Sequence, residues 1–167
     1  ERTASEADQL YILGDFFEYW AGDDDIDDPF NRSIIDAIAE LSSSGVVIYL
    51  MHGNRDFLIG RRFCRQTGAT LLQDGTVIEL YQQRVLLMHG DTLCTDDADY
   101  QAWRRIARSR DWQLEFLGLP LPERRKALQA LREKSKEVVG AKPAEIMDVN
   151  EGAVREAMRA HGLTRLV

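Results

Sequence analysis

Histidine, cysteine and long apolar runs are all scarce in this chain. The two cysteines, Cys64 and Cys94, provide neither a disulfide framework nor the paired spacing of a zinc site, so a reducing compartment such as the cytoplasm is expected. No apolar run approaches the ~20 residues of a membrane-spanning helix, and no internal repeat occurs. Histidine is found only at positions 52, 89 and 161, which limits how much of any metal site imidazole groups can supply.

The remaining composition is that of an ordinary soluble domain. The 167 residues are enough to enclose a sizeable core, and the 44 % apolar and 29 % charged fractions are typical of globular proteins. The formal net charge of −7 argues against general nucleic-acid binding. An acidic body also suits a protein that binds cations.

Residues 100–142 depart from this acidic character, because they contain eleven Lys or Arg and only five Asp or Glu. Such a basic segment could face anionic lipid or a diphosphate. It could equally be a solvated helix surface, which is the usual fate of a charge run. The sequence leaves both explanations open.

The first half of the chain alternates between strand and helix patterns, which predicts α/β architecture. Pro29 is expected to open a helix that Asp28 caps and Gly45 ends. A second helix is expected over residues 58–66. The expected strands are Leu10–Leu13, Val46–Met51, and a hairpin of Val77–Leu80 with Arg84–Met88.

From Thr95 onward the pattern becomes helical. Helices are expected over 97–108, 122–139 and 150–162, and residues 112–121 form an unusually apolar link between the first two. An insertion of this kind predicts a cap over a site. We therefore expect a core over residues 1–95, a helical cap over 96–142, and a return to the core over 143–167, with the last four residues starting another strand.

Three short phrases each follow an expected strand: Gly-Asp-Phe-Phe-Glu at 14–18, Gly-Asn-Arg-Asp at 53–56 and His-Gly-Asp at 89–91. Ligand sites in open α/β sheets gather at the carboxyl ends of strands, so we expect Asp15, Asn54 and His89 to converge at one sheet edge. A carboxylate, an amide oxygen and an imidazole suit a pair of divalent metal ions.

Each of these three residues also has a structural explanation. Asp15 could cap a turn, Asn54 could be a left-handed turn residue, and His89 could pack at a strand end. Because the phrases occur in order behind three strands, we favour metal binding for all three. Asp15 is the best bridging ligand, since two metals about 3.5–4 Å apart need a short carboxylate between them.

On these phrases the chain resembles the calcineurin-like metallophosphoesterases. Their pattern also has an Asp-x-His block before Gly14 and a Gly-His-x-His block near the end, and neither is present here. We therefore expect the chain to be a fragment or an incomplete gene product, with about half of the metal site and no activity by itself. The resemblance implies a four-layer αββα sandwich with a helical cap insertion.

Arg55 sharpens the resemblance, because most of the superfamily has a catalytic His at this place. Together with the sequence segments at 52–60, 88–97 and 146–150, it makes the chain similar to the UDP-2,3-diacylglucosamine diphosphatases of lipid A biosynthesis. That likeness implies two Mn²⁺ ions per site, attack of metal-bound water on the α-phosphorus, and the products UMP and 2,3-diacylglucosamine 1-phosphate. It also implies a location on the cytoplasmic face of an inner membrane.

The arginine has a chemical rationale. A His can protonate a poor alkoxide leaving group, whereas a diphosphate leaving group is a weak base that needs charge stabilisation more than a proton. A guanidinium supplies that charge without titrating. Arg55 and Asn54 are therefore expected to be the catalytic residues that also contact substrate.

The resemblance also implies residues that contact the substrate. Substrate contacts are expected from the start and end of the cap, with an exposed cap helix as the alternative: Asp97, Tyr100, Ser135, Val139 and Lys142. Val139 departs from the polar residue usual there, and Gly140 with Pro143 suggests that the helix ends before Lys142. Three acidic residues are expected to support the ligands or to hold Arg55, although Asp91 could simply form a turn: Glu18, Asp56 and Asp91.

The apolar link at 112–121 could line a groove for two acyl chains, or it could hold the cap helices together. A basic, apolar cap would also seat the enzyme on an anionic membrane surface. Two other functions stay open. One is another metallophosphoesterase, such as a dinucleoside-polyphosphate hydrolase, although those have His at position 55. The other is a non-catalytic nucleotide- or lipid-binding module.

Overall fold

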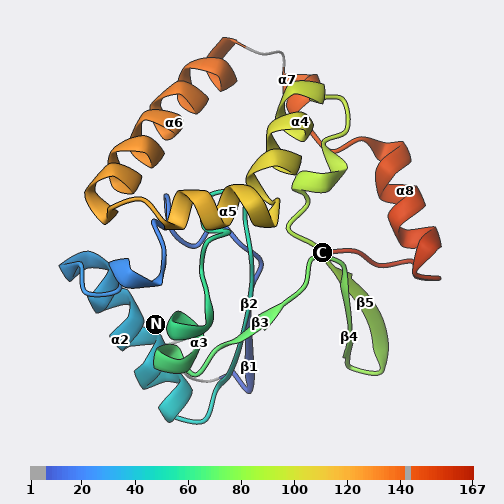
Figure 1. The fold of residues 1–167 in the computed structure, drawn as a ribbon. Helices are drawn as coiled ribbons and strands as arrows, with labels where there is room; N and C mark the ends of the chain where they lie inside the picture. The colour runs from blue at the N-terminus through green and yellow to red at the C-terminus, as the bar shows by residue number, and fades with distance from the viewer. Residues whose placement is uncertain (1–6, 142–143) are drawn as a thin grey trace. The chain divides into compact units, whose positions relative to one another are not determined.

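The computed structural model describes residues 7–141 and 144–167, and the chain forms two compact units, Glu1–Gln73 and Asp74–Val167 (Figure 1). The boundary between the units falls inside the core predicted over residues 1–95. The predicted limits of the cap, at 96 and 142, stay predictions. Each unit is described separately below.

The first unit is built on a parallel sheet of order β1-β2-β3. Its strands are β1 (Gln9–Ile12), β2 (Val47–Met51) and β3 (Thr70–Leu72). The sequence predicted β1 and β2 to within one residue but not the three-residue β3. Because β1 and β2 are parallel neighbours, the loops at their carboxyl ends leave the sheet at one edge, and these loops carry Asp15 and Asn54.

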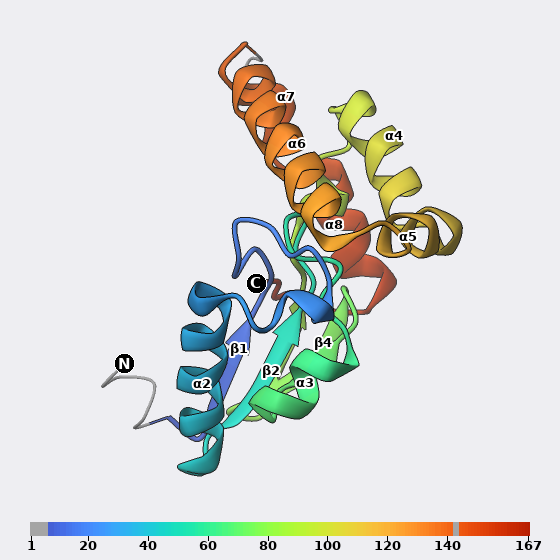
Figure 2. The same cartoon turned by 60° about the vertical axis from the view of Figure 1, so that its left-hand side comes forward.

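Helix α2 (Pro29–Ser43) begins and ends as the sequence predicts. The Asp28 carboxylate accepts hydrogen bonds from the backbone nitrogens of Phe30 and Asn31, at 3.0 and 3.5 Å, and Pro29 occupies the first turn. Gly45 follows the helix with a φ of 104°. Ile35 and Ile38 are buried, and α2 packs beside α3 next to the sheet (Figures 1 and 2).

Helix α3 (Arg61–Thr67) begins three residues later than predicted. Its cap comes from outside the helix, because the Asp23 carboxylate, in the short helix η1 (Asp23–Asp25), accepts hydrogen bonds from the backbone nitrogens of Gly60, Arg62 and Phe63 at 2.7–3.2 Å. A run of aspartates in a loop gives no local signal that one of them caps a helix 37 residues away.

Three aromatic rings form the centre of the first unit. Trp20 and Phe63 are almost fully buried, with ring centroids 5.4 Å apart, and Phe17 contacts Trp20 at 4.7 Å and Phe63 at 5.9 Å. Edge-to-face and tilted contacts of this kind add to the stabilisation from burial. The cluster fixes the segment that follows Asp15.

The second unit begins with an antiparallel hairpin of β4 (Thr76–Leu80) and β5 (Gln83–Leu87), which form a separate two-stranded sheet. The hairpin was predicted, and its turn uses Tyr81 and Gln82 at positive φ without a glycine. The prediction that all three phrases share one sheet edge was wrong for His89, because β5 does not belong to the sheet of β1 and β2.

The chain end returns to this hairpin. Leu166 forms a parallel bridge with Leu86, with hydrogen bonds of 2.9–3.0 Å between residues 165–167 and 86–88. This pairing confirms that the last residues adopt an extended conformation. The four-layer sandwich predicted from the resemblance stays a prediction, and the observed class is mixed α/β with one parallel and one antiparallel sheet.

The helical part of the second unit contains the three predicted helices and two short ones that were not predicted. The residues between the first two predicted helices are not a plain link, because Ser109 caps an additional helix by accepting from the backbone nitrogen of Trp112 at 3.3 Å. The helices are α4 (Ala98–Ala107), α5 (Arg110–Leu117), α6 (Leu121–Ala141), α7 (Ala144–Met147) and α8 (Glu151–Ala160).

Aromatic rings join α4 to α5. Trp103 contacts Trp112 edge-to-face at 5.7 Å, and Trp112 stacks on Phe116 at 4.7 Å. These contacts show that the apolar stretch packs α5 against α4. The prediction that it also lines an acyl groove stays untested.

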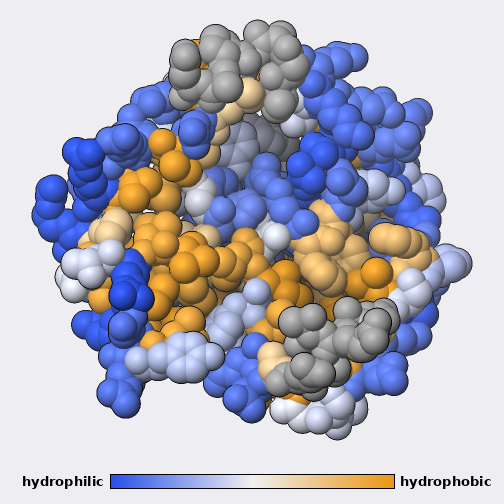
Figure 3. Space-filling model, turned by 180° about the vertical axis from the view of Figure 1, so that it is seen from behind, coloured by the Kyte–Doolittle hydropathy of each residue, from blue (hydrophilic) through white to orange (hydrophobic). Residues whose placement is uncertain are grey.

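Apolar side chains also reach the surface of the molecule. Figure 3 shows apolar residues exposed on one face, next to hydrophilic ones. On α4 and α5, Ile106 and Leu114 are more than half exposed. Across the described helices, none is both long and apolar enough to cross a bilayer.

Candidate functional site

The Gly14–Asp15 turn places a carboxylate at the end of β1. Gly14 has a φ of 95° and Asp15 a φ of 52°, so both adopt left-handed backbone conformations, which a non-glycine residue rarely does. Such a conformation costs of order 1–3 kcal/mol and persists where the surroundings hold it. A tight turn therefore follows β1, and Asp15 itself is part of it.

The end of β2 meets this turn directly. The Asp15 Oδ1 atom accepts a hydrogen bond from the backbone nitrogen of Arg55 at 2.9 Å. The Asn54 amide, with its nitrogen toward Asp15, donates to both carboxylate oxygens at 2.8 and 2.9 Å. The structure therefore brings together Asp15, Asn54 and Arg55, as the sequence predicted for two of the three phrases.

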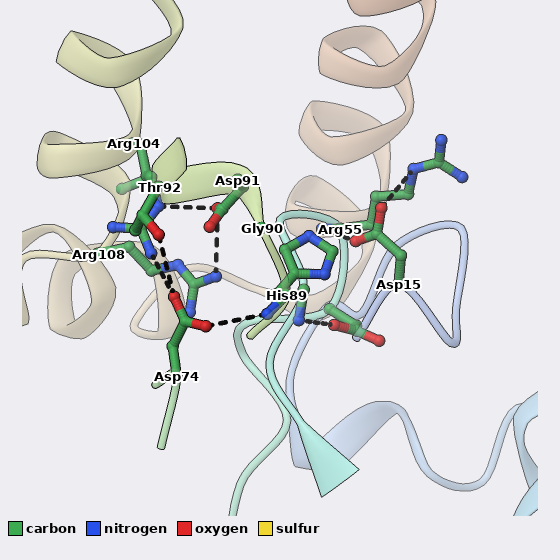
Figure 4. A network of polar contacts seen from close by, with 12 residues as sticks. Asp15, Arg55, Asp74, His89, Gly90, Asp91, Thr92, Arg104 and Arg108 are labelled. Atoms are coloured by element: carbon green, nitrogen blue, oxygen red, sulfur yellow. Dashed lines mark hydrogen bonds and ion pairs between the residues drawn. The ribbon is translucent and has the colours of Figure 1, made fainter. Parts of the chain in front are cut away.

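The Arg55 side chain is held by two carboxylates. Its Nε atom lies 3.2 Å from Asp15 Oδ2, and its Nη1 atom donates to Glu18 Oε1 at 3.3 Å (Figure 4). The Arg55 side chain is one-third exposed, so a ligand can reach it from solvent. Glu18 is thus placed where the sequence suggested, as a partner of Arg55.

Asp56 links the loop that follows β1 to the loop that follows β2. Its side chain is fully buried, and it accepts hydrogen bonds from the backbone nitrogens of Gly53 and Phe16, both at 2.7 Å, and from that of Phe17 at 3.4 Å. A buried carboxylate is stable only when hydrogen-bonded in this way. Asp56 therefore holds these two loops together through their backbone.

Gly53 is required by close approach of the two loops. A Cβ atom at this position would overlap the backbone nitrogen and the carboxylate of Asp15 and would lie 2.9 Å from its Cα atom. No side chain fits there without moving the turn. The geometry of the Gly14–Asp15 turn therefore requires a glycine at position 53.

The donor set at this edge fits a divalent cation. The Asp15 carboxylate and the Asn54 amide are in direct contact, and rotating the amide by half a turn would place its oxygen against both carboxylate oxygens, an arrangement that only a cation between them would stabilise. Within the described residues, no three His, Cys, Asp or Glu side chains gather as a metal-binding group. The two-manganese site stays a prediction.

In the second unit, His89 stands at the start of a tight turn after β5. Gly90 has a φ of 94°, and the short helix η2 (Asp91–Leu93) follows. The backbone nitrogen of His89 donates to Asp74 Oδ1 at 2.9 Å. The turn is therefore held by a residue just before β4 that the sequence analysis did not identify.

Asp91 is the centre of a buried polar network. Its Oδ2 atom accepts from Arg104 Nε at 2.7 Å and from the Tyr100 hydroxyl at 2.8 Å, while Oδ1 is buried with no partner among the described residues. Burial alone would raise the pKa of Asp91, but the hydrogen bonds from Arg104 and Tyr100 outweigh it and hold that pKa below its ordinary value. Asp91 is thus more than a turn residue.

Two positions predicted to contact substrate have structural partners. Asp97 is buried and caps α4 by accepting from the backbone nitrogen of Tyr100 at 3.1 Å. Burial, and then the neighbouring Asp91 charge, raise the pKa of Tyr100 above its ordinary value. Whether either residue also touches substrate stays a prediction.

The remaining predicted cap positions lie on or after α6. Ser135 is exposed on this helix. Val139 falls within the bounds of α6, which extends past Gly140 to Ala141 and therefore further than predicted. Lys142 lies outside the described residues.

The other two histidines are engaged in local contacts. The His52 Nε2 atom lies 2.7 Å from the carbonyl oxygen of Ile59, and His161 Nδ1 lies 2.8 Å from that of Ala157 at the end of α8. Both contacts are to backbone carbonyl oxygens seven or fewer residues away along the chain. The sequence missed Asp23, Asp74 and Arg104, whose partners lie 13 to 40 residues away along the chain and leave no local signal.

Comparison with known proteins gives a consistent result. No protein-family model matches this chain. The chain is similar to proteins named UDP-2,3-diacylglucosamine hydrolase from Escherichia coli O139:H28, Shigella boydii serotype 18 and Shigella flexneri. Each is 52 % identical over 164 residues, which cover 98 % of this chain and 68 % of the relative.

Proposed function

This chain belongs to the family of UDP-2,3-diacylglucosamine hydrolases, and on that premise we propose that it hydrolyses the diphosphate of UDP-2,3-diacylglucosamine to UMP and 2,3-diacylglucosamine 1-phosphate, a step of lipid A biosynthesis. The observation that carries the proposal is the contact of Asp15, Asn54 and Arg55 at one edge of the parallel sheet. The identity to the named hydrolases favours this substrate over a dinucleoside polyphosphate.

Asp15 and Asn54 would hold divalent cations through a carboxylate and an amide oxygen, and His89 would supply an imidazole. Two Mn²⁺ ions are the proposed cofactors; when bound, such ions activate water for attack on phosphorus and offset phosphate charge. Asp91 Oδ1, which has no partner among the described residues, is available to accept a hydrogen bond from the His89 ring and so to fix its orientation.

Arg55 would bind the diphosphate. Its guanidinium lies beside the carboxylates of Asp15 and Glu18. If Asp15 binds a cation instead, the contact with Glu18 would still keep the Arg55 guanidinium next to that cation. A fixed positive charge there offsets the charge that develops on the leaving phosphate. This role needs no proton transfer from residue 55.

The cap is proposed to select the lipid part of the substrate. Asp97, Tyr100, Ser135, Val139 and Lys142 are the proposed contacts, and the exposed apolar residues of α4 and α5, such as Ile106 and Leu114, would face acyl chains or the membrane. The basic segment would seat the protein on the cytoplasmic face of an anionic inner membrane. The proposed overall architecture is the four-layer αββα sandwich with this cap.

Hydrolysis in ¹⁸O-labelled water tests the proposal. Attack on the α-phosphorus places the label in UMP, whereas attack on the other phosphorus places it in the sugar phosphate, and mass spectrometry separates the two. The assay uses the 167-residue chain and an extended protein that carries an added Asp-x-His block at its start and an added Gly-His-x-His block at its end. Label in the sugar phosphate, or hydrolysis of dinucleoside polyphosphates in preference, would overturn the proposed reaction.

A further inference from the structure

The start of the hairpin places a carboxylate beside His89. In the β4–β5 ladder Thr76 pairs with Leu87 and Leu80 with Gln83, and Asp74 and Gly75 form a turn directly before this ladder. The Gly75 nitrogen donates to the Leu87 carbonyl at 3.1 Å, so Gly75 and Thr76 both face Leu87 and the register shifts by one residue there. Asp74 is brought to the His89 turn by this close approach of the two chain segments.

The Asp74 side chain makes three contacts around this turn. Oδ1 accepts from the backbone nitrogen of His89 at 2.9 Å, and Oδ2 lies 3.5 Å from the Thr92 hydroxyl and 3.8 Å from Arg104 Nη2. The side chain is about one-quarter exposed. Figure 4 shows Asp74 between the His89 backbone and the side chains of Arg104 and Arg108.

Arg104 fixes Asp74 from the other side. Its Nε atom donates to Asp91 Oδ2 at 2.7 Å while its Nη2 atom faces Asp74. One guanidinium thus bridges the carboxylate that precedes the hairpin and the carboxylate that follows His89. Arg108 lies 3.9 Å from Asp91 and adds a second positive charge, so two arginines face two carboxylates across the turn.

We propose that Asp74 is a positioning residue for His89. By accepting the His89 backbone N–H, and by being held in place by Arg104, it sets the direction in which the His89 ring leaves the turn. The inference rests on the proposed function, because it assigns Asp74 to the support of a residue proposed to bind metal. Groups that orient a metal ligand in this way typically change metal affinity by 10- to 100-fold when removed.

The test compares Asp74→Ala with Asp74→Asn. The alanine removes every contact, whereas the asparagine keeps an oxygen that can accept the His89 N–H but loses the charge. Glu79→Gln is the matched control, since it removes an exposed carboxylate from the same hairpin, where Glu79 pairs with Arg84. The readouts are hydrogen exchange of the His89 amide in the 167-residue chain, and Mn²⁺ affinity, kcat and KM in the extended protein.

The expected result has three parts. Asp74→Ala increases exchange of the His89 amide at least about tenfold and raises the Kd for Mn²⁺ by about tenfold, and it lowers kcat with little change in KM. Asp74→Asn restores amide protection and keeps Mn²⁺ affinity within about threefold of the unmodified protein, and Glu79→Gln changes none of these.

Other outcomes separate the two proposals. Unchanged exchange and Mn²⁺ affinity in Asp74→Ala, or equal losses in Asp74→Ala and Asp74→Asn, overturn the role of the hydrogen bond and leave the hydrolase function standing. An unmodified extended protein that neither binds Mn²⁺ nor hydrolyses the substrate overturns the proposed function, and the positioning role with it.

Discussion

At the scale of single residues, the position of Asp15 and Asn54 depends on groups that hold the backbone of the loops after β1 and β2. Asp56 receives three backbone N–H groups from two loops, and Gly53 allows those loops to touch. Their effect reaches the chemistry through Asp15, whose left-handed backbone is held by its neighbours.

Gly53→Ala is expected to abolish the geometry of Asp15. The added methyl group collides with the Asp15 backbone, so the carboxylate must shift, and a misplacement of about 1 Å at a catalytic site can cost about 100-fold in rate. Hydrolysis by the extended protein measures this loss. Gly118→Ala is the control, because a Cβ there meets neighbours at 3.3 and 3.4 Å; retention of full activity in Gly53→Ala would contradict the close-approach argument.

Tyr100→Phe is expected to lower the free energy of unfolding by about 1.5–3 kcal/mol at pH 7, since the hydroxyl donates to a charged Asp91. The folded pKa of Tyr100 is raised above its unfolded value, so its contribution is fully present below pH 10 and is lost as pH rises above that value. The stability difference between the two proteins should therefore narrow in alkaline solution.

Denaturant titrations at a series of pH values measure this difference. Tyr81→Phe is the control, because that side chain is 99 % exposed. A difference that stays constant from pH 7 to the alkaline limit of folding would contradict the link between Tyr100 and Asp91.

At the scale of elements, local signals predicted most helices and strands, and long-range contacts explain the exceptions. Asp28 and Pro29 mark the start of α2 within the sequence itself. The start of α3 was wrong because its cap, Asp23, lies 37 to 40 residues earlier. β3 was not predicted because three residues are too few to show the alternation of apolar and polar side chains that marks a strand.

The same distinction applies to the site. Asp15, Asn54 and Arg55 were predictable because each belongs to a phrase with a fixed relation to a strand. Asp74 was not, because its significance comes from a hydrogen bond to the His89 backbone 15 residues later and not from its neighbours in sequence. Positioning residues of this kind have no spacing signature of their own.

Asp23→Ala is expected to destabilise the protein by about 1–2 kcal/mol, because α3 loses the acceptor for three backbone N–H groups. Chemical denaturation gives the magnitude, and hydrogen exchange should show faster exchange at the start of α3. Asp36→Ala, at an exposed position on α2, should change stability by no more than about 0.5 kcal/mol. Equal effects of the two substitutions would show that Asp23 is not a cap.

At the scale of the whole molecule, charge is divided unevenly along the chain. The net charge is −7, yet residues 100–142, which include most of α4 and all of α5 and α6, are basic. Exposed apolar residues occur in the same helices. The combination is what a peripheral membrane surface requires.

Sedimentation with lipid vesicles tests this surface. Binding to vesicles rich in anionic lipid is expected at low salt, with marked weakening at about 0.5 M salt, where the Debye length falls to a few ångströms. Neutral vesicles are the control. Absence of binding at low salt, or equal binding to neutral and anionic vesicles, would argue against the membrane proposal.

The most direct measurement is the rate of UDP-2,3-diacylglucosamine hydrolysis by the extended protein with Mn²⁺ and with a chelator. The account predicts metal-dependent hydrolysis that is lost in Asn54→Ala and Arg55→Ala and retained in Arg61→Ala, an exposed arginine outside the site. Metal-independent hydrolysis, or full activity without Asn54 and Arg55, would contradict the account.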